Sequence, residues 1–141
     1  MTIKTYWRGF IDAQDKTNYE EGGPVVTSER EGILAPLAKL LGEKVHEYRS
    51  GYYVPLNKGW EDKLDDTEDK DYARGWFAAR GKRYKEPLKL TVSGQPKPFI
   101  RLVKKELNLD LPKPQKPSST SKMERVTITG DKALTLNNWL K

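Results

Sequence analysis

The chain has 141 residues, with 26 Lys and Arg against 20 Asp and Glu, which gives a formal net charge of +6. Four Trp, seven Tyr and three Phe argue against a disordered chain, while the absence of cysteine and the single histidine exclude disulfide scaffolds, Cys-based zinc sites and His-rich metal centres. No apolar run approaches the roughly 20 residues that span a bilayer, and the N-terminus lacks a signal-peptide pattern. We therefore expect a soluble, intracellular protein with no membrane partner.

The charge is divided unevenly along the chain. Residues 1–71 carry 10 Lys and Arg against 15 Asp and Glu, whereas residues 72–141 carry 16 against 5. Such an asymmetry indicates that one half meets a polyanion, and a basic half of this strength favours contact with nucleic acid. The alternative, a solvated surface with unevenly placed charges, stays open at this point.

The first predicted elements are a short helix over residues 5–14 and a short strand over residues 25–27, separated by a polar, glycine-rich loop. Ser28 and Glu31 have the spacing of a capping box. A proline inside a helix is costly, however, so we expect the next helix to begin near Pro36.

A hairpin follows, because Tyr- and Val-rich segments at 45–50 and 52–58 flank a Ser-Gly pair. The acidic segment 60–71 is expected to form a short helix that leads into a linker. The second half then predicts a helix, a strand that alternates apolar and polar residues, a helix, a Pro/Lys/Ser-rich loop, a strand and a last helix capped by Asp131. These elements cover residues 71–81, 88–93, 98–109, 112–122, 125–129 and 131–141.

The two halves repeat the same order of elements. Residues 6–13 (YWRGFIDA) align with residues 72–79 (YARGWFAA), and residues 36–41 (PLAKLL) align with residues 98–103 (PFIRLV). The offsets differ by four residues, which fits a shorter loop after the second copy. Matching segments in matching order predict an internal duplication.

Residues 8–15 (RGFIDAQD) and 74–81 (RGWFAARG) resemble the two copies of the LAGLIDADG motif of homing endonucleases. The resemblance implies an α+β, pseudo-twofold fold made of two halves, residues 1–70 and 71–141, in one compact unit. Two motif helices would pack at its centre, and small antiparallel sheets would form a saddle over the DNA major groove. The pseudo-dimer helix interface would contain Gly9, Phe10, Gly75 and Trp76.

The motifs depart from the family where its chemistry takes place. The acidic residue before the final glycine of each motif binds the metal ions for phosphodiester cleavage in that family. Here these positions hold Gln14, which is followed by Asp15, and Arg80. A neutral amide is a poor Mg²⁺ ligand and a guanidinium is none, so we expect no bound metal, no other cofactor and no nuclease activity. The alternative is residual cleavage with one metal held by Asp12 and Asp15.

The candidate DNA-binding residues are cations after the second motif, polar residues on the outward faces of strands, lysines of the Pro/Ser-rich loop and one arginine of the first-half hairpin. Arg80 is expected to neutralise a phosphate at the former active centre. The full set is Arg80, Lys82, Arg83, Lys85, Lys89, Thr91, Ser93, Lys113, Lys116, Lys122, Arg125, Thr127, Thr129 and Arg49.

The leading hypothesis is thus a catalytically inactive, LAGLIDADG-like protein with a regulatory or accessory role, which binds double-stranded DNA in the cytoplasm or at the nucleoid. One alternative is a protein-binding adaptor or inhibitor on a retired nuclease scaffold, with the acidic first half as the contact surface. Another is an RNA-binding, maturase-like protein.

Overall fold

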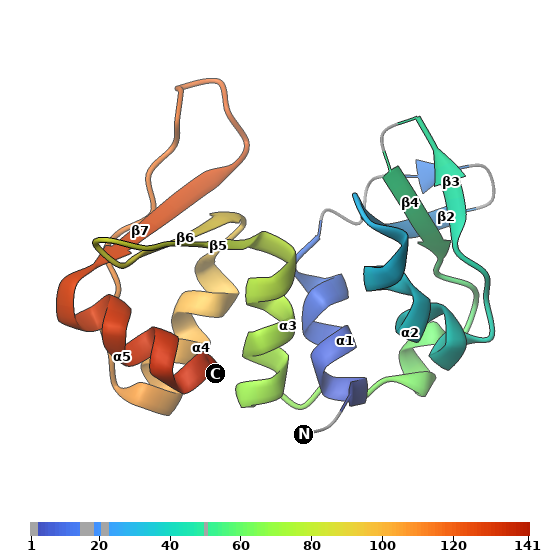
Figure 1. Cartoon of the computed structure of the whole chain (residues 1–141), viewed down its shortest axis with the longest axis horizontal. Coiled ribbons are helices and arrows are strands. Elements are labelled where there is room, and N and C mark those ends of the chain that lie inside the picture. The colour runs from blue at the N-terminus through green and yellow to red at the C-terminus, as the bar shows by residue number, and fades with distance from the viewer. Residues whose placement is uncertain (1–2, 15–18, 21–22, 50) are drawn as a thin grey trace. The chain divides into compact units, whose positions relative to one another are not determined.

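The computed structural model describes residues 3–14, 19–20, 23–49 and 51–141 (Figure 1). The loop expected at residues 16–24 is therefore described only in part, and Asp15 and Ser50 lie outside the described residues. The chain forms two compact units: residues 1–14 with 66–141, called the larger unit below, and residues 15–65, called the smaller unit. This division differs from the halves 1–70 and 71–141, because the first motif helix belongs to the larger unit.

The larger unit combines four of the described helices with a three-stranded sheet of order β5-β6-β7, in which both strand pairs are antiparallel. Its elements are α1 (Ile3–Asp12), α3 (Lys70–Arg80), β5 (Gly81–Tyr84), β6 (Lys89–Gly94), α4 (Lys97–Leu107), β7 (Glu124–Thr129) and α5 (Gly130–Leu140). The strand β5 has no counterpart in the sequence prediction.

The smaller unit has a sheet of order β1-β2-β4-β3 whose pairs are all antiparallel. Its elements are β1 (Tyr19–Glu20), β2 (Gly23–Ser28), α2 (Glu31–Leu41), β3 (His46–Tyr48), β4 (Gly51–Pro55) and the 3₁₀ helix η1 (Trp60–Lys63). The hairpin and the short helix predicted for residues 45–71 are confirmed. Among the described residues, no helix of either unit has the length and apolarity to cross a membrane.

The prediction that the second helix begins near Pro36 is wrong. The helix α2 begins at Glu31 and contains Pro36 in its interior. Gly32, four positions earlier, and Pro36 are both exposed, so the carbonyl of Gly32, which loses its helical hydrogen bond to residue 36, faces solvent. The capping box does not form either, because the N-cap residue of α2 is Arg30 and not Ser28. The hydroxyl of Ser28 instead accepts a hydrogen bond from the backbone nitrogen of Arg30 at 3.3 Å.

The prediction that Asp131 caps the last helix is also wrong. The N-cap residue of α5 is Thr129, whose side chain makes no capping hydrogen bond. Asp131 lies in the first turn, where a carboxylate faces the partial positive charge of the helix N-terminus.

The helices α1 and α3 pack directly against each other within the larger unit (Figure 1). A Cβ atom at Gly9 would overlap the carbonyl oxygen of Tyr72, and a Cβ atom at Gly75 would overlap that of Tyr6. The two backbones therefore touch, and only glycine fits at either position. We call this contact the helix seam.

The other two residues assigned to the helix interface place their rings elsewhere. The backbone nitrogen of Phe10 lies beside Gly75 in the seam, but its ring packs edge-on against Trp7 at 5.1 Å. The ring of Trp76 packs on Phe99 of α4, at 5.7 Å between ring centroids. Both rings are buried, so they stabilise apolar packing on either side of the motif helices.

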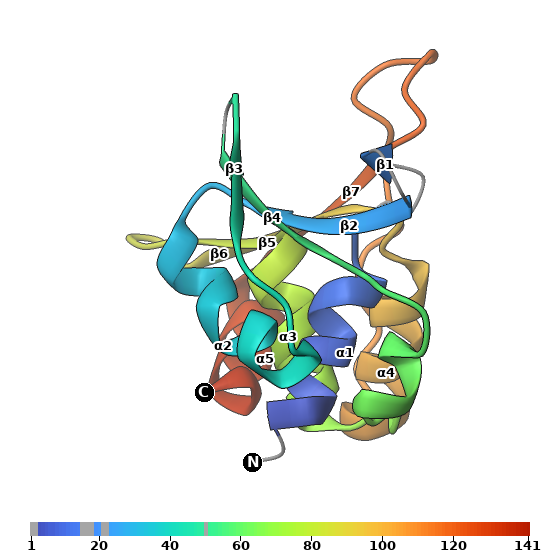
Figure 2. The ribbon, with the colours of Figure 1, turned by 90° about the vertical axis from the view of Figure 1, so that its right-hand side faces the viewer.

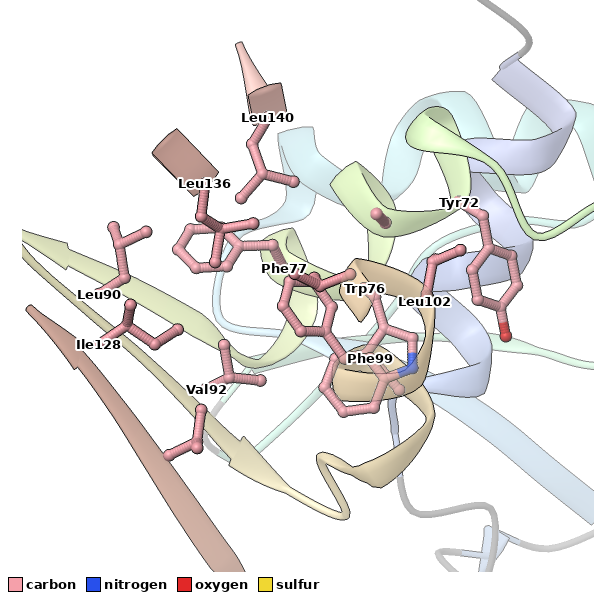
Figure 3. Close-up of a cluster of buried hydrophobic side chains, with 14 of the residues drawn as sticks. Tyr72, Trp76, Phe77, Leu90, Val92, Phe99, Leu102, Ile128, Leu136 and Leu140 are labelled. Carbon is pink, nitrogen blue, oxygen red and sulfur yellow. The ribbon is translucent and has the colours of Figure 1, made fainter. Parts of the chain in front are cut away.

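The core of the larger unit lies between one face of its sheet and the helices (Figure 3). The alternation predicted for residues 88–93 is confirmed, because Leu90 and Val92 are fully buried, as are Val126 and Ile128 beside them on β7. Figure 3 shows Leu90, Val92 and Ile128 on the side of the strands that faces Phe77 and Leu136. Burial of this face fixes which strand residues point outward, since successive side chains alternate between faces.

Candidate nucleic-acid interface

The outward face of the larger unit's sheet is polar and basic. The register of the strands aligns two complete rows across it, one through Lys82, Thr91 and Thr127 and one through Tyr84, Lys89 and Thr129. Ser93 of β6 lies opposite Arg125 of β7 in a third, shorter row. We call these eight side chains the outer sheet face: Lys82, Tyr84, Lys89, Thr91, Ser93, Arg125, Thr127 and Thr129.

The outer sheet face contains cations and hydroxyl groups but no Asp or Glu. Its cations are Lys82, Lys89 and Arg125, of which Lys89 is half-buried and the other two are exposed. The ammonium of Lys89 lies 4.6 Å from the centroid of the Tyr84 ring, so a cation–π contact orients it on the sheet. Lysine and arginine contact phosphates, while hydroxyl groups donate to and accept from both phosphates and base edges.

The structure separates Arg83 from the other predicted cations. Arg83 lies opposite Leu90, in a row of the buried face. Its guanidinium donates a hydrogen bond to the side-chain oxygen of Asn137 on α5 and lies 4.8 Å above the ring of Phe77. Arg83 is therefore held against the helices, and Tyr84 takes the outward place beside Lys89. Tyr84 was not among the predicted residues because β5 was not predicted as a strand, and residues 81–84 (GKRY) have no apolar alternation that would identify one.

The predicted loop lysines extend beyond the sheet. Lys85 is exposed in the turn between β5 and β6, and Lys113, Lys116 and Lys122 are exposed in the segment between α4 and β7. Figure 1 and Figure 2 show this segment extending past the end of β7, away from the helices.

Backbone pairing anchors the base of that segment. Gln115 and Arg125 exchange two backbone hydrogen bonds, at 2.9 and 2.8 Å, and the side chain of Gln95 donates to the carbonyl of Lys122 at 3.0 Å. The segment therefore continues the sheet edge on which Arg125 lies.

The outward face of the smaller unit's sheet is aromatic. Tyr53 of β4 lies between Thr27 of β2 and His46 of β3, and its ring stacks on His46 with a centroid distance of 5.1 Å. Tyr48 packs edge-on against the same ring at 5.8 Å. The predicted residue Arg49 belongs to this unit, where it is exposed at the turn after β3.

The C-terminal ends of the motif helices hold Arg80 in place of a metal ligand. The Nε of Arg80, the last residue of α3, donates to the carbonyl oxygen of Ala13, just past the end of α1, at 3.0 Å. Gln14 is the next residue and is half-buried. Among the described residues, no group of three or more His, Cys, Asp or Glu side chains is arranged to hold a metal ion.

Asp12 was expected, with Asp15, to hold a metal ion in the alternative of residual cleavage. Its side chain instead makes contacts between and along the motif helices. Its carboxylate accepts a hydrogen bond from the hydroxyl of Tyr72 at 2.6 Å and pairs with Arg8 at 3.2 Å. Burial of the hydroxyl, reinforced by its hydrogen bond to Asp12, raises the pKa of Tyr72 above its usual value. Asp15 lies outside the described residues, so its place is not assigned.

A second basic surface was not predicted. The helix α4 exposes Lys97, Arg101, Lys104 and Lys105, and Lys104 forms an ion pair with Asp110 at 2.9 Å. The signal lies in the spacing of residues 97–105, where these cations fall between the buried positions of one helix. The surface belongs to a helix that packs below the sheet, so it is separate from the outer sheet face.

Comparison with protein-family profiles and with curated proteins finds no match. Among solved structures, the fold is similar to the N-terminal LAGLIDADG domain of DUF199/WhiA, with a TM-score of 0.68 and 12% identity over 97% of this chain and 79% of that one.

Two structures of the homing endonuclease I-DmoI are also similar. The complex with DNA and Ca has a TM-score of 0.68 and 15% identity over 98% of this chain and 88% of that one. The complex with DNA and Mn has a TM-score of 0.65 and 17% identity over 98% of this chain and 95% of that one. The chain therefore has a LAGLIDADG-like fold, a mixed architecture of helices with two small antiparallel sheets.

Proposed function

We propose that this protein binds double-stranded DNA through the outer sheet face of the larger unit and does not cleave it. The observation that carries the proposal is the composition of that face: it has three cations, four hydroxyl-bearing Ser and Thr side chains and one Tyr, with no carboxylate. Two neighbouring strands of the sheet form a ribbon of the size that the major groove admits. I-DmoI, which has a similar fold, is described in complex with DNA.

The proposed lack of cleavage rests on the side chains at the ends of the motif helices. Gln14 offers a neutral amide and Arg80 a permanent cation, whereas two-metal phosphodiester cleavage needs carboxylates to hold the ions. A protein that holds DNA without cutting it fits a regulatory or accessory role at the nucleoid or elsewhere in the cytoplasm. Incubation of supercoiled plasmid with Mg²⁺ or Mn²⁺ is expected to give no nicked product.

The binding proposal is tested by fluorescence anisotropy with a labelled duplex of mixed sequence at low salt. We expect binding whose affinity falls steeply with added salt, because neutralised phosphates release counterions. Lys89→Ala with Arg125→Ala should weaken binding about 100-fold, whereas the matched pair Arg101→Ala with Lys105→Ala on α4 should change it by less than about threefold. Absence of duplex binding at low salt would refute the proposal, and stronger binding to a structured RNA would favour the RNA-binding alternative.

A second candidate function, protein binding by the smaller unit, is favoured by its aromatic outward face. Tyrosine is enriched at protein interfaces because it combines apolar area with a hydroxyl group. Tyr48 and Tyr53 are the contact candidates. A single partner that co-purifies in stoichiometric amount after nuclease treatment, and is lost with Tyr48→Ala and Tyr53→Ala, would establish this function.

A further inference from the structure

The contact between Arg80 and Ala13 closes the C-terminal end of the first motif helix. The backbone nitrogen of Ala13 donates to the carbonyl of Gly9 at 3.1 Å, so Ala13 ends the last turn, and its own carbonyl lies past the end of the helix. Carbonyl groups at this end of a helix lack a partner inside the helix. The guanidinium of Arg80 supplies that partner from the other motif helix.

Two residues at the end of β6 hold Arg80 in this position. The hydroxyl of Ser93 donates to the backbone carbonyl of Arg80 at 3.3 Å. A Cβ atom at Gly94 would lie 3.3 Å from Nε of Arg80, which is closer than most Cβ contacts, and Gly94 has a φ of +97°, which favours glycine. Glycine at 94 therefore leaves room for the arginine to lie along the sheet end.

The electrostatics of this position favour a cation. The C-terminal end of an α-helix carries a partial negative charge, and both motif helices end here. The guanidinium stays charged at any physiological pH. Of the guanidinium nitrogens, only the Nε of Arg80 donates a hydrogen bond to a described residue. Neither terminal nitrogen of the guanidinium has a hydrogen-bond partner among the residues that the structure describes. Two such nitrogens form the planar fork that matches two oxygens of a phosphate.

The same residues do not fit the divalent ion with which I-DmoI is described. Gln14 and Arg80 bring an amide and a guanidinium, and the Asp12 carboxylate is occupied by Tyr72 and Arg8. A divalent ion beside Arg80 would also meet a fixed positive charge within a few ångströms.

We infer that Arg80 is a phosphate-binding residue, and that its guanidinium supplies the positive charge that a divalent ion supplies in a metal-dependent relative. DNA binding by this chain is then independent of divalent ions. The inference rests on the proposed DNA-binding function, because it assigns a backbone phosphate of the bound duplex to the two terminal nitrogens of Arg80.

The test compares duplex affinity in EDTA and in MgCl₂ at equal ionic strength. The wild type should bind equally well in both, within about twofold, and Arg80→Gln should weaken binding about tenfold and reduce the salt slope by about one ion. Arg80→Lys keeps the charge but loses the fork, so it should keep the slope and recover only part of the affinity. The matched control Lys105→Gln removes one exposed charge of α4 and should leave both quantities unchanged.

The outcomes separate the inference from the function on which it rests. Absence of duplex binding in both buffers refutes the proposed function itself. Wild-type binding that requires Mg²⁺, or an Arg80→Gln variant with unchanged affinity and salt slope, overturns the role of Arg80 while leaving DNA binding intact. Circular dichroism of Arg80→Gln shows whether this variant folds. If it does not fold, Arg80→Lys is measured in its place, and a smaller salt slope in Arg80→Lys than in the wild type overturns the inference.

Discussion

The two units build the same strand order and present different outward faces. The smaller unit has the order β1-β2-β4-β3, and the larger unit has β5-β6-β7 followed by the backbone pair of Gln115 with Arg125, which takes the place of a fourth strand. The buried faces are alike, with Val26 and Val54 in one sheet and Val92 and Val126 in the other. The outward faces carry a histidine–tyrosine cluster in one unit and cations with hydroxyl groups in the other.

This difference teaches which part of a duplicated fold is free to change. Apolar burial fixes the inward residues, because their replacement leaves cavities or unpaired polar groups. The outward residues contribute little to the core, so each copy can acquire its own surface. The charge follows the same division: residues 15–65 carry 7 Lys and Arg against 10 Asp and Glu, whereas the remainder carries 19 against 10.

The largest expected effect compares a glycine of the helix seam in the larger unit with a glycine of α2 in the smaller unit. Gly75→Ala places a methyl group on the carbonyl of Tyr6 and should lower the free energy of unfolding by about 3 kcal/mol or more. Gly32→Ala in α2, where the added carbon meets no atom within 4 Å beyond its chain neighbours and the helix's own backbone, should instead raise it by about 0.5–1 kcal/mol. Urea denaturation measures both, and a tolerated Gly75→Ala would contradict the direct backbone contact of the helix seam.

The next effect compares the charges of the two units. Neutralising Lys89 and Arg125 should reduce duplex affinity about 100-fold, with a salt slope smaller by about two ions, because we propose that both contact phosphates. Neutralising Lys39 and Arg49 in the smaller unit should change affinity by less than about threefold. Equal losses in the two variants would show that both units share the DNA contact.

A smaller effect distinguishes a tyrosine of the helix pair from an exposed one. Tyr72→Phe removes the hydrogen bond to Asp12 and should cost about 1–2 kcal/mol of unfolding free energy, whereas Tyr48→Phe at the surface of the smaller unit should cost almost nothing. An unfolding free energy that is unchanged in Tyr72→Phe would show that the bond adds nothing to stability.

The pKa of Tyr72 adds a pH dependence to this comparison. Its folded-state pKa is raised from the usual 10.0, so the unfolded chain releases this proton first, and stability is lost as the pH rises above about 10. Below that pH the contribution is fully present. Urea titrations at rising pH should therefore show a steeper alkaline decline for the wild type than for Tyr72→Phe; equal slopes would contradict the raised pKa.

The smallest expected effect concerns a variant that restores carboxylates to the ends of the motif helices. The double variant Gln14→Glu with Arg80→Glu brings two acids to the helix ends, so its unfolding temperature should rise by a few degrees on addition of Mn²⁺. The wild type should show no such rise. An unfolding temperature of the double variant that does not change with Mn²⁺ would contradict the placement of residues 14 and 80 at one site.

Much of this fold follows from local sequence signals, and the errors have identifiable causes. The strand β6 and the helix α4 were predicted because their apolar residues repeat at periods of two and 3.6. The strand β5 was missed, since residues 81–84 (GKRY) have no apolar alternation and Lys82, Arg83 and Tyr84 are all exposed. The start of α2 was misplaced because Pro36 lies on the exposed side of the helix, where the lost hydrogen bond of the Gly32 carbonyl costs less than it would in the core.

The candidate site was predictable in composition but not in arrangement. Lys89, Thr91, Thr127 and Thr129 were assigned to outward faces from alternation alone, and the structure places them there. The bond from Arg80 to Ala13 joins residues 67 positions apart, and no local pattern encodes such a contact. Arg83 illustrates the converse, since it was expected beside the outward cations, while the strand register places it opposite Leu90 and its guanidinium bonds to Asn137 of α5.

The helix seam also bears on how the chain tolerates changes in length. Asp12 and Tyr72 meet across 60 positions of sequence, so the seam forms only when the intervening segment closes into a loop. The entropy of closing a flexible loop grows slowly with its length, by about 0.6 kcal/mol for each doubling. Residues inserted into the exposed turns between the motif helices therefore add little to the entropy of closure, and the segment between the two motifs can lengthen or shorten while the seam stays the same.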